Sequence, residues 1–225
     1  MFGCVIFDFD GTLIDLGKYV NWDKACRQII DLYRSVGLPK DVVMKYSCNP
    51  LSLTANTYDD LFKALPEDEA NKILEKASRI LEVEEFLALS KATVVPGCEE
   101  ILRWLKAQRV HVGLISSNSG RIISYLLKKF KLNNFVENVV GRQARVRMKP
   151  YSDQIHLCLE RIGCQPENTA LVAVDEDAVR AAKASGIHVI VVLSGSGHPI
   201  GRLLDARTDS IVENLRELLS LFQQL

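Results

Sequence analysis

Two aspartates near the start of the chain are its best candidates for chemistry. Asp8 and Asp10 follow a short apolar run, in the sequence Cys4-Val5-Ile6-Phe7-Asp8-Phe9-Asp10-Gly11-Thr12. Side chains alternate between the two faces of a strand, so both carboxylates point roughly the same way, and Gly11 then allows a sharp turn. Such a pair can bind a metal ion, or one carboxylate can attack an electrophile while the other moves protons. A simple Asp-Gly turn at the end of a strand is the alternative.

A second polar stretch is Ser116-Ser117-Asn118-Ser119, which follows the apolar run Val110 to Ile115 and precedes a helical pattern. Hydroxyl groups and backbone N–H groups at the start of a helix suit a phosphate oxygen. The same cluster also fits an ordinary helix N-cap, so the stretch alone leaves both interpretations open.

A third candidate is Lys149, which stands before Pro150 at the end of an irregular basic stretch. Its charge could neutralise both a bound phosphate and an attacking carboxylate. A single lysine is more often a solvated surface charge. The preceding Arg142, Arg145 and Arg147 are also expected at the surface, with guidance of an anionic substrate as the alternative.

The fourth candidate is Asp175-Glu176-Asp177, directly after the apolar run Ala170 to Val174. Three acids at the end of a strand could complete an oxygen-rich magnesium site with Asp8 and Asp10. Acidic residues also collect at helix N-termini because they suit the helix dipole, and both interpretations can hold together.

The elements that must position these residues alternate along the chain. Short Val- and Ile-rich runs predict buried parallel strands, and amphipathic patterns between them predict helices. The expected strands are 5–8, 110–115, 170–174 and 187–192, and the expected helices are 99–108, 120–131, 152–162 and 177–185. This order predicts an α/β fold with a doubly wound, mostly parallel sheet, in which ligands bind at the carboxyl ends of the strands.

Residues 15–92 have a different texture, with amphipathic helical patterns and no convincing strand. One apolar face carries Trp22, Cys26, Ile29 and Tyr33 at helical spacing. The segment is too long for a loop, so we expect a small helical domain inserted after the first strand. Residues 1–14 and 93–225 then form the α/β core domain, to which Pro96-Gly97 marks the return.

Composition sets limits on the partners. The chain has 225 residues, and its 28 Lys and Arg balance its 28 Asp and Glu, so no overall charge favours nucleic acid or an anionic membrane. The apolar runs are too short to cross a bilayer, and acids fall among residues 1–20 where a signal peptide would be apolar, so we expect a cytoplasmic protein. The six cysteines form no CxxC pair and are expected to be buried thiols.

Taken together, the order Asp-x-Asp-Gly-Thr, helical insert, strand-Ser, Lys-Pro and strand-acids resembles the haloacid dehalogenase superfamily, in its phosphatase branch with a helical cap. In detail it is similar to the phosphoglycolate phosphatase-like group. The resemblance implies a Mg²⁺-dependent phosphatase that hydrolyses a small phosphorylated metabolite through an aspartyl phosphate. By position, Asp8 is the implied nucleophile, Asp10 the general acid and base, Ser116 the phosphoryl-binding residue, and Lys149 the group that steadies nucleophile and phosphate.

The resemblance further implies that Gly11, Thr12, Ser117 and Asn118 bind the phosphate and that Asp8, Asp10 and Asp175 hold Mg²⁺. The fourth motif departs from the family pattern, because without a gap the expected Gly-Asp and the second Asp fall on Ala173, Val174 and Ala178. A loop one residue shorter would bring Asp175 to the metal, with Asp177 in support. The alternatives are a weakened metal site in a non-catalytic or weakly active protein, and a phosphomutase, which shares the core motifs.

Overall fold

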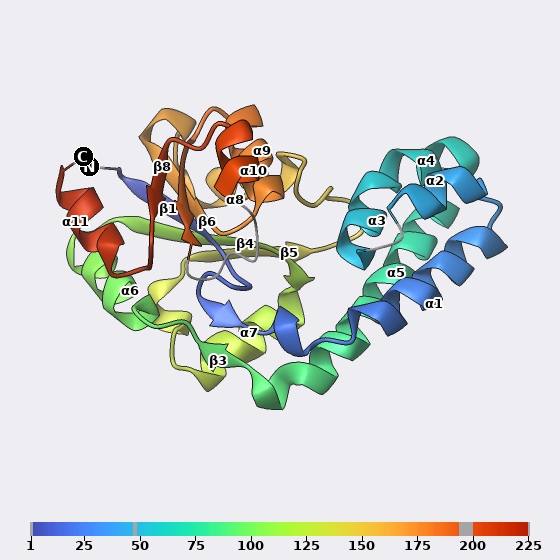
Figure 1. The fold of residues 1–225 in the computed structure, drawn as a ribbon, viewed down its shortest axis with the longest axis horizontal. Coiled ribbons are helices and arrows are strands. Elements are labelled where there is room, and N and C mark those ends of the chain that lie inside the picture. Colours follow the sequence, from blue (N-terminus) through green and yellow to red (C-terminus); the bar gives the residue numbers. More distant parts are fainter. Residues whose placement is uncertain (1, 47–48, 194–199, 225) are drawn as a thin grey trace.

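A six-stranded parallel sheet forms the centre of the molecule (Figure 1). The computed structural model describes residues 2–46, 49–193 and 200–224. In spatial order the strands are β5 (Asn138–Arg142), β4 (His111–Ser119), β1 (Cys4–Asp8), β6 (Thr169–Ala173), β7 (His188–Val192) and β8 (Ser210–Val212). The chain runs outward from β1 to β4 and β5 and then returns to the other side of β1 with β6. This reversal opens a crevice at the carboxyl end of β1.

Both faces of the sheet are covered, as alternation along β1 shows. Val5 and Phe7 belong to one apolar cluster, and Cys4 and Ile6 belong to the other. The first cluster includes residues of α6 (Cys98–Ala107), α7 (Gly120–Lys129) and α11 (Glu217–Gln224). The second includes residues of α8 (Asp153–Ile162), α9 (Glu176–Ala184) and α10 (Ile200–Asp205). The predicted doubly wound α/β fold is therefore confirmed.

Each strand and helix expected in the α/β part is present to within one or two residues, with one exception. Strand β4 does not end at Ile115 but continues through Ser119, with a register shift between these two residues. Strands β5 and β8 were not expected, because β5 ends on the charged Arg142 and β8 has only three residues. Periodicity over such short, partly polar segments is too weak a signal.

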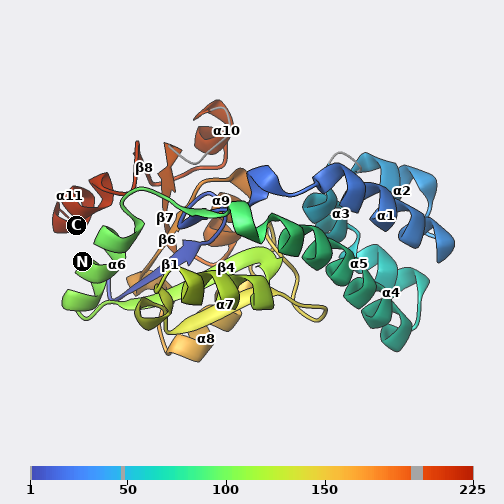
Figure 2. The same ribbon diagram turned by 90° about the horizontal axis from the view of Figure 1, so that it is seen from below.

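The segment between β1 and α6 folds into five helices that extend to one side of the sheet (Figures 1 and 2). They are α1 (Trp22–Ser35), α2 (Lys40–Lys45), α3 (Pro50–Asn56), α4 (Tyr58–Ala64) and α5 (Glu67–Ala88). Ile29, Leu53 and Leu81 are wholly buried members of a third apolar cluster, which is separate from the two against the sheet. Residues 15–92 are called the helical region below.

The two chain connections to the helical region lie side by side. Strand β2 (Ile14–Asp15) on the way out pairs antiparallel with β3 (Thr93–Val94) on the way back, and the 3₁₀ turns Gly17–Tyr19 and Leu89–Lys91 adjoin them. Helix α5 runs from the helical region to the sheet, where Ala88 joins the first apolar cluster. The crossing therefore consists of a short ribbon and one long helix.

Two further features of the described residues are the hydropathy of the helices and the burial of the cysteines. None of the helices described is both long and apolar enough to pass through a bilayer. Four of the cysteines, Cys4, Cys26, Cys98 and Cys158, are buried as predicted, and Cys164 is half-buried. Cys48 lies outside the described residues.

Gly141 supplies a test of the packing between β5 and the start of α7. A Cβ atom at this position would lie 2.6 Å from the backbone nitrogen of Gly120 and 2.9 Å from the carbonyl oxygen of Asn118. Because backbone must shift to make room, we expect Gly141→Ala to lower the free energy of unfolding by about 1–3 kcal/mol, as overpacking usually does. Gly120→Ala is the matched control, since no atom lies within 4 Å of its added Cβ. Urea denaturation of both variants checks this, and equal effects would contradict it.

Candidate active site

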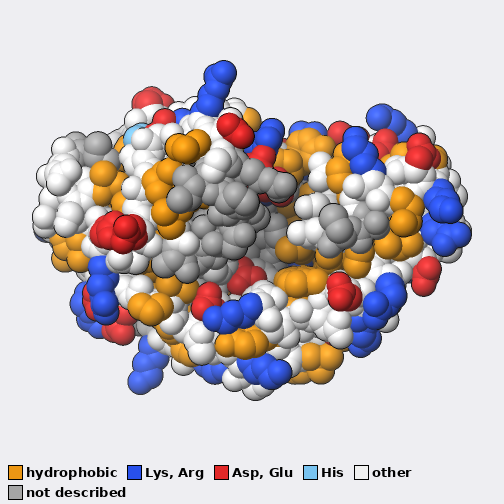
Figure 3. Space-filling model, in the orientation of Figure 1, with side chains coloured by type: hydrophobic (Ala, Val, Ile, Leu, Met, Phe, Trp, Pro, Cys, Tyr) orange, Lys and Arg blue, Asp and Glu red, His pale blue; other side chains and the backbone are white. Residues whose placement is uncertain are grey.

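A cleft of about 470 Å³ opens where the carboxyl ends of the central strands face the helical region. In Figure 3 the surface is hollowed between these two parts, with acidic side chains beside the hollow. A cleft of this size accommodates a small metabolite. It is lined by Asp8, Asp10, Asn49, Leu51, Ser52, Ser116, Ser117, Asn118, Lys149, Val174, Asp175, Glu176 and Asp177.

Lys149 lies between two carboxylates at the floor of this cleft. Its Nζ is 2.9 Å from Oδ2 of Asp8, at the end of β1, and 2.7 Å from Oδ2 of Asp175, just after β6. The other oxygen of Asp175 accepts a hydrogen bond from the backbone N–H of Ala178 at 2.7 Å and so caps α9. Asp175 therefore caps α9 and lines the cleft at the same time, and its role in the site stays a prediction.

The surroundings of Asp8 and Asp175 shift the pKa values of these two carboxyl groups in opposite directions. Burial raises the pKa of Asp8 to about 7, although the charge of Lys149 opposes this, and the charge of Asp175 raises it further. Burial also acts to raise the pKa of Asp175, but the charge and hydrogen bond of Lys149 and the N–H of Ala178 outweigh it and leave this pKa below its usual value. A further cation beside Asp8 would favour its charged form, which is the form that attacks electrophiles.

Asp10 is held by the first residues of the helical region. Its Oδ1 accepts hydrogen bonds from the backbone N–H groups of Leu16 at 3.0 Å and Gly17 at 2.9 Å. A Cβ atom on Gly17 would lie 2.3 Å from the other oxygen of Asp10, so only glycine allows this approach. Burial raises the pKa of Asp10, the two N–H groups lower it, and the charge of Glu85 raises it again. A carboxyl group whose pKa is raised holds its proton more firmly and is better suited to act as an acid.

The polar stretch after Ile115 is ordered by its own hydrogen bonds. The hydroxyl of Ser116 donates to Oδ1 of Asn118 at 2.9 Å, and the backbone N–H of Asn118 donates to Ser116 Oγ at 3.1 Å. Gln154 of α8 donates from Nε2 to the carbonyl oxygens of Ser116 and Val140. Ser119 accepts from the N–H of Arg121 and is the N-cap of α7. The stretch thus combines a helix cap, at Ser119, with cleft-lining groups before it.

Most of the predicted site residues meet in this cleft. Asp8, Asp10, Ser116, Ser117, Asn118, Lys149 and Asp175 all line it, as does Asp177. The predicted phosphate-binding residues Gly11 and Thr12 are not among the lining residues. Gly11 has a φ of +76° and forms the expected turn, and Thr12 is wholly buried. A part for Gly11 and Thr12 in phosphate binding stays a prediction.

The surface position expected for Arg142 is wrong. Its side chain is only 2% exposed and pairs with Glu85 of α5, whereas Arg145 is exposed and Arg147 pairs with Asp153. These three arginines lie close together in one irregular stretch, so the residues around them do not indicate which one is buried. They differ because the unexpected strand β5 carries Arg142 inward.

The helical region contributes residues that the sequence did not indicate. Asn49, Leu51 and Ser52 line the cleft, and the side chain of Asn49 caps α3 through the N–H groups of Leu51 and Ser52. Asn49-Pro50 is a clear signal for the start of a helix. Nothing in the spacing, however, tells which way that helix start will face.

The donor set of the cleft fits Mg²⁺. Across residues 2–46, 49–193 and 200–224, no three Asp, Glu, His or Cys side chains form a complete metal-binding group by themselves. Mg²⁺ does not require one, because it binds through one or two carboxylates and fills its other positions with water and phosphate oxygens. Asp8 and Asp175 supply two carboxylates that share one lysine. Asp177 lines the same cleft, and burial raises its pKa.

Comparisons with known proteins agree with this geometry. Residues 5–192 match the family model for haloacid dehalogenase-like hydrolases. The chain is 29% identical over 222 residues to a phosphoglycolate phosphatase of Pseudomonas putida, covering 96% of this chain and 78% of that protein. It is 24% identical over 230 residues to a phosphoglycolate phosphatase of Nitrosococcus oceani, covering 98% and 96%.

Solved structures show the same fold. A putative haloacid dehalogenase-like hydrolase from Bacteroides fragilis superposes with a TM-score of 0.69 at 18% identity, covering 97% of this chain and 100% of that one. A hydrolase from Pseudomonas syringae also gives 0.69, at 21% identity, covering 99% and 98%.

The raised pKa of Asp8 predicts how stability changes with pH. Because the pKa in the folded protein is about 7 and the ordinary value is 3.8, the folded state binds this proton more tightly than the unfolded state. The resulting stabilisation is complete below pH 3.8 and is lost as the pH rises through 7. Asp8→Asn cannot lose a proton, so in metal-free buffer its stability relative to the natural protein should increase between pH 4 and pH 8.

Urea denaturation in the presence of a chelator, at pH 4, 6 and 8, measures this difference. Asp31→Asn, at an exposed position on α1, is the control for the chemistry of the substitution. If both variants differed from the natural protein by an amount independent of pH, the buried and destabilised charge assigned to Asp8 would be incorrect.

Proposed function

The chain belongs to the haloacid dehalogenase-like hydrolases, and we propose that it is a phosphatase that hydrolyses a small phosphorylated metabolite through an aspartyl phosphate on Asp8. The observation that carries this proposal is the contact of Lys149 with both Asp8 and Asp175 in the cleft that Asp10 and Ser116 also line. These residues come from four separate stretches of the chain. The proposed attack on a phosphate uses a nucleophile, an acid, a cation and a phosphate-binding group, and these must lie at one place.

In the proposed mechanism, a carboxylate oxygen of Asp8 attacks the phosphorus atom, and the bond from phosphorus to the leaving oxygen breaks. Asp10 gives a proton to that oxygen, which leaves as an alcohol. Asp10 then takes a proton from a water molecule, whose oxygen attacks the phosphorus of the aspartyl phosphate and restores Asp8. Burial raises the pKa of Asp10 above the usual value of an aspartate, which favours the protonated form that this exchange needs.

The other residues act on charge and orientation. Lys149 neutralises part of the charge of Asp8 and of the phosphate, and Ser116 with the backbone of Ser117 and Asn118 would hold the phosphate oxygens. Mg²⁺, held by the carboxylates of Asp8 and Asp175 and the carbonyl of Asp10, would supply the positive charge that lets an anionic nucleophile approach an anionic phosphate. The cleft, of about 470 Å³, leaves room for the remaining Mg²⁺ ligands.

We further propose that the helical region is a cap domain on an α/β core formed by residues 1–14 and 93–225. Its separate apolar cluster and its two adjacent connections support this division. Asn49, Leu51 and Ser52 reach the cleft from the cap side and would contact the part of the substrate beyond the phosphate. Because relatives over nearly the whole chain are named phosphoglycolate phosphatases, 2-phosphoglycolate is the first substrate to test.

Phosphate release provides the direct test. The natural protein with Mg²⁺ should release inorganic phosphate from 2-phosphoglycolate or from an aryl phosphate such as 4-nitrophenyl phosphate. Asp8→Asn should lower kcat by at least about a thousandfold, because removal of a nucleophile leaves only binding and electrostatic effects. Equal rates for the two proteins would contradict the proposal. Isomerised sugar phosphate without free phosphate would indicate a phosphomutase instead.

Metal affinity tests the assignment of Asp175. In calorimetric titrations with MgCl₂, Asp175→Asn should weaken binding by about tenfold or more, as loss of a ligand usually does, whereas Asp177→Asn should change it by less than about threefold. The reverse pattern would move the ligand to Asp177. No measurable Mg²⁺ binding by the natural protein, together with no phosphate release, would favour a non-catalytic member of the family.

A further inference from the structure

A buried ion pair joins the helical region to the sheet, next to the polar stretch Ser116–Ser119. Glu85, on the last turns of α5, accepts hydrogen bonds from Arg142 of β5, with Oε1 to NH1 at 2.8 Å and Oε2 to NH2 at 3.1 Å. Glu85 is wholly buried, and the side chain of Arg142 is almost so. Two buried charges cost several kcal/mol in desolvation each, so the pair must be fully bonded to be tolerated.

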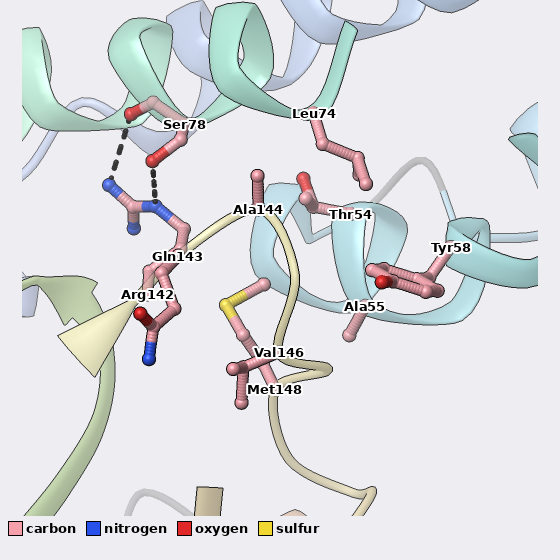
Figure 4. Close-up of a pocket in the computed structure, with 10 residues that line it drawn as sticks. All are labelled: Thr54, Ala55, Tyr58, Leu74, Ser78, Arg142, Gln143, Ala144, Val146 and Met148. Atoms are coloured by element: carbon pink, nitrogen blue, oxygen red, sulfur yellow. Dashed lines mark hydrogen bonds between the residues drawn. The ribbon is translucent and has the colours of Figure 1, made fainter. Parts of the chain in front are cut away.

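Arg142 has no donor left for a substrate. Its five N–H groups are matched by five bonds: two go to Glu85, one to the carbonyl oxygen of Ser117, one to the carbonyl oxygen of Ser78 and one to Ser78 Oγ. Figure 4 shows the two bonds to Ser78, which lies two turns before Glu85 on α5. The cavity drawn there holds about 20 Å³, which is room for about one water molecule. The donors of Arg142 are therefore engaged within the protein and not free to bind an anionic substrate.

Glu85 holds the phosphate-binding stretch directly. Oε1 accepts from Nδ2 of Asn118 at 3.2 Å, and Oε2 accepts from the backbone N–H of Ser119, also at 3.2 Å. A carboxylate can only accept, so it turns the NH₂ group of Asn118 toward itself and leaves the amide oxygen to face the hydroxyl of Ser116. One carboxylate on α5 thus fixes the orientation of Asn118, and through it that of Ser116.

From these contacts we infer that Glu85 and Arg142 are positioning residues that hold Ser116, Ser117 and Asn118 in place to bind phosphate. This inference rests on the proposed function for the role of that stretch. Neither residue lines the cleft. Arg142 fixes the carbonyl of Ser117 and the Glu85 carboxylate, and Glu85 fixes the side chain of Asn118, so that the backbone N–H groups and hydroxyl keep the positions that receive phosphate oxygens.

The chain offers a closely matched control. Glu84 directly precedes Glu85 on α5 and is also buried. Its carboxylate, however, pairs with Lys24 of α1, at 2.6 Å, instead of with the polar stretch. Glu85→Gln and Glu84→Gln therefore each remove one buried charge from the same turn of the same helix. Only the first removes an acceptor from Asn118 and Ser119.

Affinity for inorganic phosphate, measured calorimetrically with Mg²⁺ present, separates the two variants. Glu85→Gln should weaken phosphate binding by about tenfold or more, the usual effect of losing charge-assisted hydrogen bonds, and Glu84→Gln by less than about twofold. With 4-nitrophenyl phosphate as substrate, Glu85→Gln should likewise raise KM. Thermal unfolding of both variants reports how much general stability each loses, and a merely structural role would lower stability without the selective loss of phosphate affinity.

The outcomes distinguish this inference from the proposed function. If the natural protein bound phosphate and released it from substrate while Glu85→Gln and Glu84→Gln bound phosphate equally well, the positioning role would be overturned and the function would stand. If the natural protein neither bound nor released phosphate, both would fall. Should Glu85→Gln not fold, Ser78→Ala loosens Arg142 without removing a charge, and it should weaken phosphate binding by about twofold or more; unchanged binding would overturn the inference.

Discussion

The contact of one lysine with two carboxylates is the constraint on which the site depends. Lys149 cannot lie within 3 Å of both Asp8 and Asp175 unless the carboxyl ends of β1 and β6 and the segment after β5 meet at one place. Burying these three charges costs stability, and their sum remains one negative charge. The fold bears this cost at the point where an added cation would relieve it. The destabilised group, Asp8, is also the one with the attacking role in the proposed chemistry.

The order of the strands in the sheet is enough to bring most of these groups together. Because β1 is central and pairs with both β4 and β6, Asp8 has the polar stretch Ser116–Asn118 on one side and Asp175 on the other. Parallel pairing brings every carboxyl end to the same edge of the sheet. The apolar residues of β1 fill both layers of the core, so the packing of its own strand places Asp8.

The sequence predicted the parts of this arrangement that follow from local rules. The same-facing pair Asp8 and Asp10, the strands before Ser116 and Asp175, and the family resemblance all come from periodicity and motif order. Arg142 was placed wrongly because its burial depends on Glu85, 57 residues earlier, which no local pattern reveals. Gly17 was missed for a similar reason, since its need for a missing Cβ arises only when the helical region folds back onto Asp10. Thr12 fits the motif but is enclosed by the fold.

Helix α5 gives the junction a mechanical meaning. It has 22 residues and is therefore about 33 Å long, and its C-terminal half, from Ser78 to Glu85, is bonded to the sheet. A tilt of about 5° at that end would displace the other end by about 3 Å, for a rod of this length. Near its C-terminal end α5 contacts Asn118 through Glu85, and the same helix packs against α1, α3 and α4 of the helical region. Binding of a phosphate at the polar stretch and the width of the cleft would then both depend on the position of this end of α5.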